Sequence, residues 1–247
     1  MAQERFAKTA VHDWRRLHPQ IVLAAASRLT ARVVGEFDEI PEQPIGGWPK
    51  RALDIVVAST ALVAAAPAMA AVFLLIKTTG MGPALFSQSR IGYGGRLFRC
   101  WKFRTMVVDA DERLEAHLAD NPDAAREWEL TRKLENDPRI TRLGKFLRRS
   151  SLDELPQLFN VLAGDMSCVG PRPVVPRELA KYGPATPDYL RARPGLTGLW
   201  QVSGRSALSY DHRVALDVDY VRRRSFWLDV TILARTLPAV MDMSAAR

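Results

Sequence analysis

The stretch RALDIVVASTALVAAAPAMAAVFLLIK, residues 51–77, decides the fold of this chain. No side chain from position 55 to position 76 is charged, and a helix of about 20 apolar residues is long enough to cross the hydrocarbon core of a bilayer. The alternative is a buried core helix, which the many alanines favour. A soluble domain of this size rarely contains so long an uncharged run, and we therefore expect this segment to enter a membrane.

Pro67 lies inside this run, and proline kinks or breaks a helix because it removes one backbone hydrogen bond and clashes with the preceding turn. The arms on either side of it, 51–66 and 68–76, would measure about 24 Å and 14 Å, so neither alone crosses a core of about 30 Å. Basic residues on both flanks favour a re-entrant hairpin over a simple span, and the sequence leaves both open. These flanking residues are Lys50, Arg51 and Lys77.

The chain of 247 residues carries 35 Lys and Arg against 27 Asp and Glu, a formal net charge of +8. This excess calls for an anionic partner, and nucleic acid, anionic lipid and phosphorylated substrates all satisfy it. The sequence has no nucleic-acid-binding motif and no ladder of stacking aromatics, so we expect no nucleic-acid partner. Its two cysteines, Cys100 and Cys168, have neither metal-ligand spacing nor a disulfide pattern, which indicates a reducing compartment.

Three other regions have a recognisable secondary-structure pattern. Residues 84–106 consist of two alternating stretches around Gly94-Gly95 and predict a β-hairpin. Residues 109–134 are highly charged and predict a solvated helix. Residues 213–241 interleave basic and apolar side chains, which fits either a helix lying on an anionic membrane or an amphipathic core helix.

The most informative block is RITRLGKFLRRSSLDELPQLFNVLAGD, residues 139–165. Its apolar residues recur at helical spacing, and Ser151 and Glu154 have the spacing of a capping box at a helix N-terminus. Asp153 and Glu154 therefore fall in the first turn of the predicted helix. Adjacent carboxylates there have a simple structural explanation, because they cap the helix and complement its dipole.

The basic residues near this carboxylate pair indicate a catalytic role. Lys145, Arg148 and Arg149 lie shortly upstream of Asp153, and cations combined with a helix N-terminus form an anion site. The same positive field would keep Asp153 ionised, as a carboxylate nucleophile requires. Attack on phosphorus would give an acyl phosphate that can pass its phosphoryl group to a second acceptor. Such chemistry between polyanions also needs a divalent cation, Mg²⁺, for which Asp153 and Glu154 are the candidate ligands.

Arginines in two proline-stiffened loops are further candidates for phosphate binding. Arg172 lies in GPRP and Arg193 lies in RPG. Stiff loops lower the ordering cost of binding, although single arginines beside proline are also common surface features.

Four segments together resemble the bacterial sugar transferases, the monotopic polyprenyl-phosphate phosphoglycosyl transferases. They are KRALDI, KFRTM, LRRSSLDELPQLFNVLAGDMSCVGPRP and RPGLTGLWQVSGR, in the order and spacing of the family. The resemblance covers about residues 50–241 and implies transfer of a hexose 1-phosphate from a UDP-sugar to undecaprenyl phosphate, with release of UMP. It also implies that Asp153 forms a covalent phosphosugar intermediate, that Glu154 assists through the metal or through proton handling, and that Arg148 binds phosphate.

Within the family, the short N-terminal extension and the loop motifs look like enzymes that initiate exopolysaccharide synthesis, with galactose the favoured sugar and glucose the alternative. The family's membrane helix is re-entrant and broken near a Ser-Pro pair, where this chain has Ala66-Pro67. The resemblance places the protein in the bacterial inner membrane, with amphipathic helices on the cytoplasmic leaflet and the catalytic part facing the cytoplasm. The residues expected to bind substrate are Arg148, Lys102, Arg104, Thr105, Arg172, Arg193, Gln201 and Arg205.

The expected architecture is a mixed α+β, mainly helical, monotopic membrane protein with a re-entrant helix broken at Pro67, a small β-hairpin and amphipathic interfacial helices. The sequence allows a homo-oligomer. The competing hypothesis is a non-catalytic membrane scaffold in which the carboxylate pair only caps a helix. The expected divisions are an N-terminal extension and linker over 1–49, the membrane helix over 50–79, a cytoplasmic catalytic domain over 80–212 and membrane-associated helices over 213–247.

Overall fold

The computed structural model describes residues 41–80, 82–131, 133–204 and 208–241. Helices dominate, and the described strands form two separate two-stranded sheets, which confirms the mixed, mainly helical class. Up to residue 40, the expected N-terminal extension lies outside the described residues. The elements are α3 (Gly47–Thr79), β1 (Leu85–Ile91), η1 (Tyr93–Gly95), β2 (Leu97–Phe103), α4 (Ala110–Asp120), α5 (Pro122–Thr131), α6 (Arg142–Arg149), η2 (Leu152–Glu154), α7 (Gln157–Ala163), β3 (Ser167–Val169), α8 (Pro176–Leu179), η3 (Ala180–Ala185), α9 (Thr186–Leu190), β4 (Gly195–Thr197), α10 (Leu199–Val202), α11 (Tyr210–Arg223) and α12 (Phe226–Met241).

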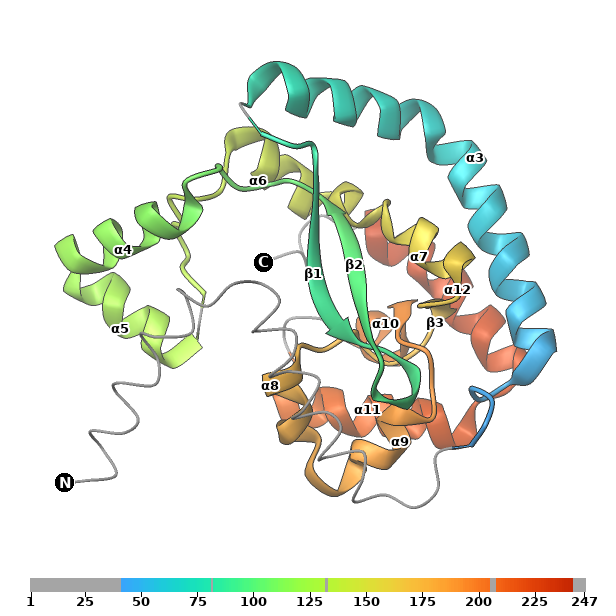
Figure 1. Ribbon diagram of the computed structural model, residues 1–247. Coiled ribbons are helices and arrows are strands. Elements are labelled where there is room, and N and C mark those ends of the chain that lie inside the picture. Colours follow the sequence, from blue (N-terminus) through green and yellow to red (C-terminus); the bar gives the residue numbers. More distant parts are fainter. Residues whose placement is uncertain (1–40, 81, 132, 205–207, 242–247) are drawn as a thin grey trace, which may run out of the picture.

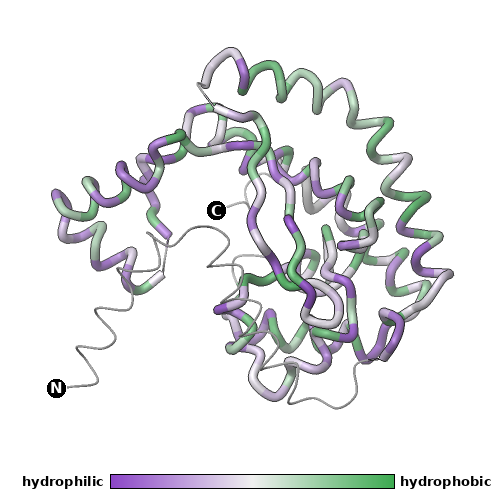
Figure 2. Tube along the Cα trace, in the orientation of Figure 1, coloured by the Kyte–Doolittle hydropathy of each residue, from purple (hydrophilic) through white to green (hydrophobic). Residues whose placement is uncertain are grey.

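Helix α3 borders one side of the molecule and then turns over its top (Figure 1). It is one continuous helix through Pro67, so the predicted break does not occur and the helix bends instead. Proline removes only one backbone hydrogen bond, and the turns before and after it keep their own hydrogen bonds. Among the described helices, α3 is the one long and apolar enough to cross a membrane by length and composition. Only 11% of its most apolar stretch is buried, unlike the core helix of a soluble domain. Figure 2 shows the apolar residues along it.

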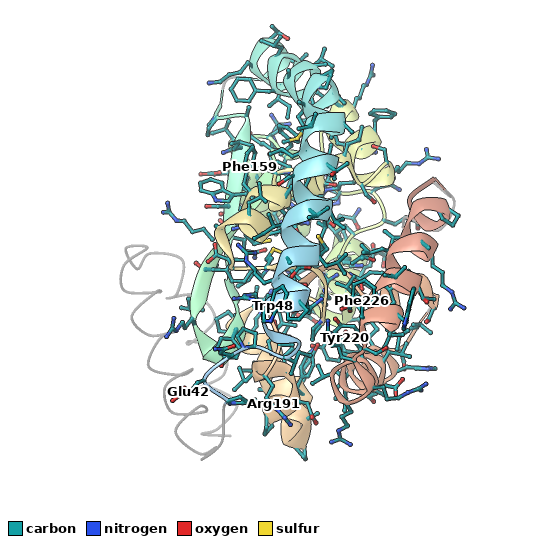
Figure 3. All side chains as sticks on the ribbon, turned by 90° about the vertical axis from the view of Figure 1, so that its right-hand side faces the viewer. Glu42, Trp48, Phe159, Arg191, Tyr220 and Phe226 are labelled. Carbon is teal, nitrogen blue, oxygen red and sulfur yellow. The ribbon has the colours of Figure 1, made fainter. Side chains whose placement is uncertain are left out.

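The charged N-terminal end of α3 is buried against the C-terminal helices. The ammonium of Lys50 lies 3.3 Å from the carboxylate of Asp229, which is fully buried. Arg224 approaches the same carboxylate oxygen at 3.0 Å, and the hydroxyl of Tyr220 donates to the other oxygen at 2.7 Å. Figure 3 shows Tyr220 beside the lower end of α3. Because buried charges are tolerated only when paired, these contacts fix α3 against α11 and α12.

The next turn of α3 binds backbone groups of the core. The guanidinium of Arg51 donates to two carbonyls in the last turn of α7, at 2.5 and 2.7 Å, where a cation also complements the helix dipole. The carboxylate of Asp54 accepts hydrogen bonds from the Ser167 hydroxyl at 2.9 Å and from the Cys168 N–H at 3.0 Å. Three charged residues of one segment therefore hold three other elements: α12, α7 and β3.

The predicted hairpin is confirmed. Strands β1 and β2 pair antiparallel, and the turn between them contains Gly94 at φ 64°, a conformation that favours glycine. The other edge of β2 binds α7 through Asn160, whose amide donates to the carbonyl of Arg99 at 2.7 Å and accepts from the N–H of Trp101 at 3.0 Å. This side chain satisfies backbone groups that a third strand would otherwise pair, and it sets the position of α7 along the hairpin.

Two of the predicted helical segments are each divided in two. The segment 109–134 forms α4 and α5 because Asn121, which precedes Pro122, is extended. The Asn121 side chain accepts hydrogen bonds from two N–H groups at the start of α5, both at 3.1 Å. The segment 213–241 lies in α11 and α12, divided at Arg224. The two helices have both buried and exposed aromatic side chains: Tyr220 of α11 is buried, and Trp227 of α12 is 75% exposed.

The short strands β3 and β4 form a parallel sheet that joins the two proline-stiffened loops. The sequence alone predicts loops there and no strands. Ser167 pairs with Gly195 and Val169 with Thr197. A Cβ on Gly195 would lie 2.1 Å from the backbone nitrogen of Gly170, so this approach is open only to glycine. The three-residue strands are too short to have an alternating pattern of their own.

We expect Asp229→Ala to lower the unfolding free energy of the detergent-solubilised protein by about 3–5 kcal/mol, because Lys50 and Arg224 would remain buried without their counter-ion. Thermal unfolding measures the effect. The matched control is Asp219→Ala, which removes the exposed i,i+4 pair with Arg223 and should cost less than about 1 kcal/mol. Equal shifts for the two variants would contradict the assignment of the buried cluster as the anchor of α3.

Candidate active site

Asp153 and Glu154 lie in the short helical turn η2, between α6 and α7. The predicted capping box is wrong. Ser151 adopts φ 56°, its side chain makes no capping bond, and its carbonyl accepts from the Glu154 N–H at 3.2 Å instead. Helix α7 begins after Pro156, so neither carboxylate caps it. Ser151 is the one non-glycine residue with positive φ among those described, and such conformations gather at functional sites.

The ammonium of Lys102 faces both carboxylates. It lies 2.5 Å from an oxygen of Glu154 and 3.9 Å from an oxygen of Asp153. Lys102 belongs to β2, next to the backbone group that Asn160 of α7 binds. The edge contact between α7 and the hairpin therefore also sets the distance between the cation and the two acids.

Arg148 reaches the same site from α6. Its Nε donates to the hydroxyl of Thr105 at 2.9 Å. Arg148 lies one helical turn after Gly144, where α6 packs against the segment that follows β2. A Cβ on Gly144 would lie 2.0 Å from the carbonyl oxygen of Thr105, so only glycine permits this packing. The structure thus brings together five of the predicted site residues: Asp153, Glu154, Lys102, Thr105 and Arg148.

The two acids differ in their electrostatic environment. Burial raises the pKa of Asp153 to about 6, and Glu154 adds to the rise while Lys102 and Arg148 oppose it. Burial tends to raise the pKa of Glu154 as well. The nearby cations, Lys102 first and then Arg172 and Arg90, have the larger effect and hold the pKa of Glu154 below the usual value. At neutral pH both are ionised, and Asp153 is the more basic carboxylate of the pair.

A cluster of cations extends this site. Partial desolvation and the fields of Arg172, Arg213 and Arg148 lower the pKa of Lys133, so these four cations lie close together. The guanidinium groups of Arg172 and Arg213 lie 5.4 and 5.3 Å from the centre of the Trp200 ring. Such a concentration of positive charge is suited to a polyanion such as a diphosphate.

Several residues of this cluster could not be predicted from the sequence. Lys133 and Arg213 come from segments that are distant in the chain, and no local motif marks them. Trp200 lies in the motif RPGLTGLWQVSGR, but the sequence alone does not show that it meets these cations. Arg90 was missed as well; it donates to the carbonyl of Pro173 at 3.0 Å and so holds the loop that carries Arg172.

Four predicted substrate-binding residues are not brought to the carboxylates. Arg104 donates to the carbonyl of Pro83, and Arg193 lies near Arg51 and Tyr93 at the start of α3. Gln201 belongs to α10, where its side-chain oxygen is buried without a hydrogen-bond partner. Arg205 lies outside the described residues.

The donor set partly fits Mg²⁺. No group of three or more acidic, histidine or cysteine side chains suited to a metal occurs within the described ranges, but Mg²⁺ often takes only one or two carboxylates together with substrate phosphates. Asp153 and Glu154 provide two, both within 4 Å of one cation, Lys102. They would hold a metal only with phosphate oxygens as further ligands.

We expect Asp153→Asn to stabilise the fold at pH 7.5. The pKa of Asp153 is about 6 in the folded chain against the ordinary value of 3.8, so its ionisation costs stability on the order of 1–3 kcal/mol above pH 6. The gain should shrink as pH falls from about 6 to 3.8, since the wild-type carboxyl then takes up a proton in the folded state. Thermal unfolding across this range tests it, with the exposed Asp120→Asn as control. A gain that persists at pH 3.8 would contradict the assigned cause.

Comparisons with known proteins identify the family of this chain. The sequence pattern of the family described as bacterial sugar transferase matches residues 45–243. The exopolysaccharide production protein ExoY of Rhizobium meliloti is 50% identical over 81% of this chain and 91% of its own length. The undecaprenyl-phosphate galactose phosphotransferase of Salmonella typhimurium is 49% identical over 80% of this chain and 41% of its own. The UDP-glucose:undecaprenyl-phosphate glucose-1-phosphate transferase of Caulobacter vibrioides is 41% identical over 80% of this chain and 71% of its own. The chain belongs to the bacterial sugar transferase family.

Proposed function

We propose that this protein transfers a hexose 1-phosphate from a UDP-sugar to undecaprenyl phosphate, releases UMP and so initiates the synthesis of exopolysaccharide repeat units. One observation carries the proposal: Asp153 is a buried carboxylate without a capping role, facing Lys102 at 3.9 Å and bordered by a cluster of cations. A buried acid in such surroundings is a candidate nucleophile.

The proposed reaction has two steps. A carboxylate oxygen of Asp153 attacks the phosphorus that carries the sugar, forming an acyl phosphate while the bond to the bridging oxygen breaks and UMP leaves. A phosphate oxygen of undecaprenyl phosphate then attacks the same phosphorus, and the Asp153 carboxylate departs unchanged. Both leaving groups are anions, so neither step needs a protonated acid.

The residues of the site have separate tasks in this scheme. Arg148 is held by Thr105 and presents charge toward the phosphoryl group. Arg172, Arg213 and Lys133 provide the field for the remaining diphosphate charge. Mg²⁺, when bound, would neutralise phosphate charge, and Glu154 beside Asp153 would help to hold it.

We favour galactose as the transferred sugar, with glucose as the alternative. Of the relatives described above, the one named for galactose is 49% identical to this chain and the one named for glucose is 41% identical. None of the described contacts distinguishes the two sugars, which differ in the orientation of a single hydroxyl.

We also propose that α3 enters the bacterial inner membrane from the cytoplasmic side and returns to it. Both ends of α3 pack on the same body: Lys50 at its start pairs with Asp229, and Ile76 near its end packs in a cluster with Phe103 and Leu147. A helix that crossed the bilayer would place its ends on opposite sides. The aromatic rings of Trp48 and Trp227 are 79% and 75% exposed, as suits residues at a membrane interface.

A non-catalytic scaffold is the second candidate. It explains the carboxylate pair as a helix cap, and it loses support because Pro156 is the N-cap of α7 and Ser151 makes no capping bond.

The first test is UMP release by the detergent-purified chain with undecaprenyl phosphate, Mg²⁺ and a panel of UDP-hexoses. We expect UMP release beyond the first turnover to depend on the lipid, and all release to fall at least 1,000-fold, an order-of-magnitude estimate, in Asp153→Asn, because the nucleophile is lost. The control Asp120→Asn, at an exposed position of α4, should keep wild-type activity. Wild-type UMP release that survives Asp153→Asn would reject Asp153 as nucleophile, and no release with any sugar would favour the scaffold.

The second test concerns the topology of α3. Trp48→Cys and Thr78→Cys place thiols at its two exposed ends, while the natural cysteines are buried. A membrane-impermeant maleimide should label both new thiols in inverted inner-membrane vesicles and neither in intact spheroplasts. Labelling of the two positions from opposite sides would replace the re-entrant arrangement by a span.

A further inference from the structure

A shallow apolar hollow lies between the hairpin and α7. It has a volume of about 220 Å³ and is lined by Leu85 of β1, Trp101 of β2, and Pro156 and Phe159 at the start of α7. Phe159 is 50% exposed and Leu85 is 37% exposed, so the rim presents large apolar side chains to the surroundings. Figure 3 shows Phe159 alongside α3.

The hollow begins one helical turn from the candidate nucleophile. Pro156 follows Asp153 by three positions through a helical turn, and residues at this spacing are neighbours on a helix, about 5–6 Å apart. Phe159 follows by another three, and its N–H donates to the Pro156 carbonyl at 3.1 Å. On the hairpin, Trp101 directly precedes Lys102, the cation that faces Asp153. Because successive side chains of a strand point to opposite faces, the hollow and the carboxylates lie on the two sides of β2, next to the edge that α7 covers.

The polarity of the side chains differs sharply between the hollow and the surroundings of Asp153. Around Asp153 the surroundings are cationic, whereas the four residues that line the hollow are uncharged. A nucleobase or a sugar placed there would lose hydrogen bonds to water without replacement. The hollow is also smaller than the roughly 300–1,000 Å³ of pockets that enclose whole ligands. A phosphate on one side and hydrocarbon on the other is the pattern of a lipid phosphate.

We propose that this hollow binds the first isoprenyl units of the acceptor, next to its phosphate, and so aims a phosphate oxygen at the phosphorus held on Asp153. The inference rests on the proposed function and adds the residues that select a prenyl chain. Because α7 packs against α3, a chain leaving the hollow past Phe159 meets the exposed apolar surface of α3. Binding would cover Phe159 and Leu85, which is favourable for apolar surface otherwise in contact with water.

The test separates the two steps of the reaction in the full chain. The burst of UMP with UDP-galactose and no acceptor reports the first step. Discharge of the intermediate by dimethylallyl, geranyl and farnesyl phosphates reports the second. The variants are Phe159→Ala and Leu85→Ala. The matched control is Phe146→Ala on α6, a phenylalanine of similar exposure, 55%, that does not line the hollow.

We expect Phe159→Ala to raise KM for geranyl phosphate on the order of 10-fold, with Leu85→Ala acting in the same direction. The UMP burst, KM for UDP-galactose and thermal stability should stay at wild-type values, and Phe146→Ala should leave the acceptor KM unchanged. An unchanged acceptor KM in Phe159→Ala, or an equal rise in Phe146→Ala, overturns the inference and leaves the hollow as a contact for bulk lipid. A wild-type chain that gives no burst with any UDP-hexose instead overturns the proposed function, and this inference with it.

Discussion

The ion pair between Lys50 and Asp229 is the constraint on which the rest of the structure depends. Both side chains are almost fully removed from water, and two such charges are tolerated only at close range with further hydrogen bonds, which Tyr220 and Arg224 provide here. The exposed apolar side chains of α3 fit any hydrocarbon surface equally, so its direction depends on the contacts at its two ends. The charged cluster fixes the start of α3, and the packing of Val72 and Ile76 against Phe103 and Leu147 fixes its other end.

The same segment of α3 also determines the position of the candidate active site. Arg51 binds the last carbonyls of α7, and Asp54 binds the start of β3. Asn160 then fixes α7 to the edge of β2, and β2 delivers Lys102 to the carboxylates at the other end of α7. These hydrogen bonds link α3 to α7 and α7 to β2, so the start of α3 supports the two elements that border the candidate site.

Features with a local signal could be predicted from the sequence, and features built across the chain could not. The apolar run and the Gly94-Gly95 turn each carry their own pattern, and both appear as expected. The pairing of β3 with β4 and the meeting of Lys133 with Arg213 depend on distant segments, so no pattern marks them. The capping box failed for another reason: Ser151 has the right spacing, but its left-handed backbone removes the side chain from the cap.

The placement of Asp153 suits a carboxylate to both steps of the proposed transfer. Burial raises its pKa to about 6, which makes it a stronger nucleophile than a free aspartate, yet it remains ionised at neutral pH. The same basicity is modest enough for the carboxylate to leave again when a phosphate attacks the acyl phosphate. A fully solvated aspartate would be a weaker nucleophile, and so would a carboxylate whose pKa a close lysine holds below the usual value, as Lys102 does for Glu154. The free energy that the burial of Asp153 costs is therefore tied to its proposed role as nucleophile.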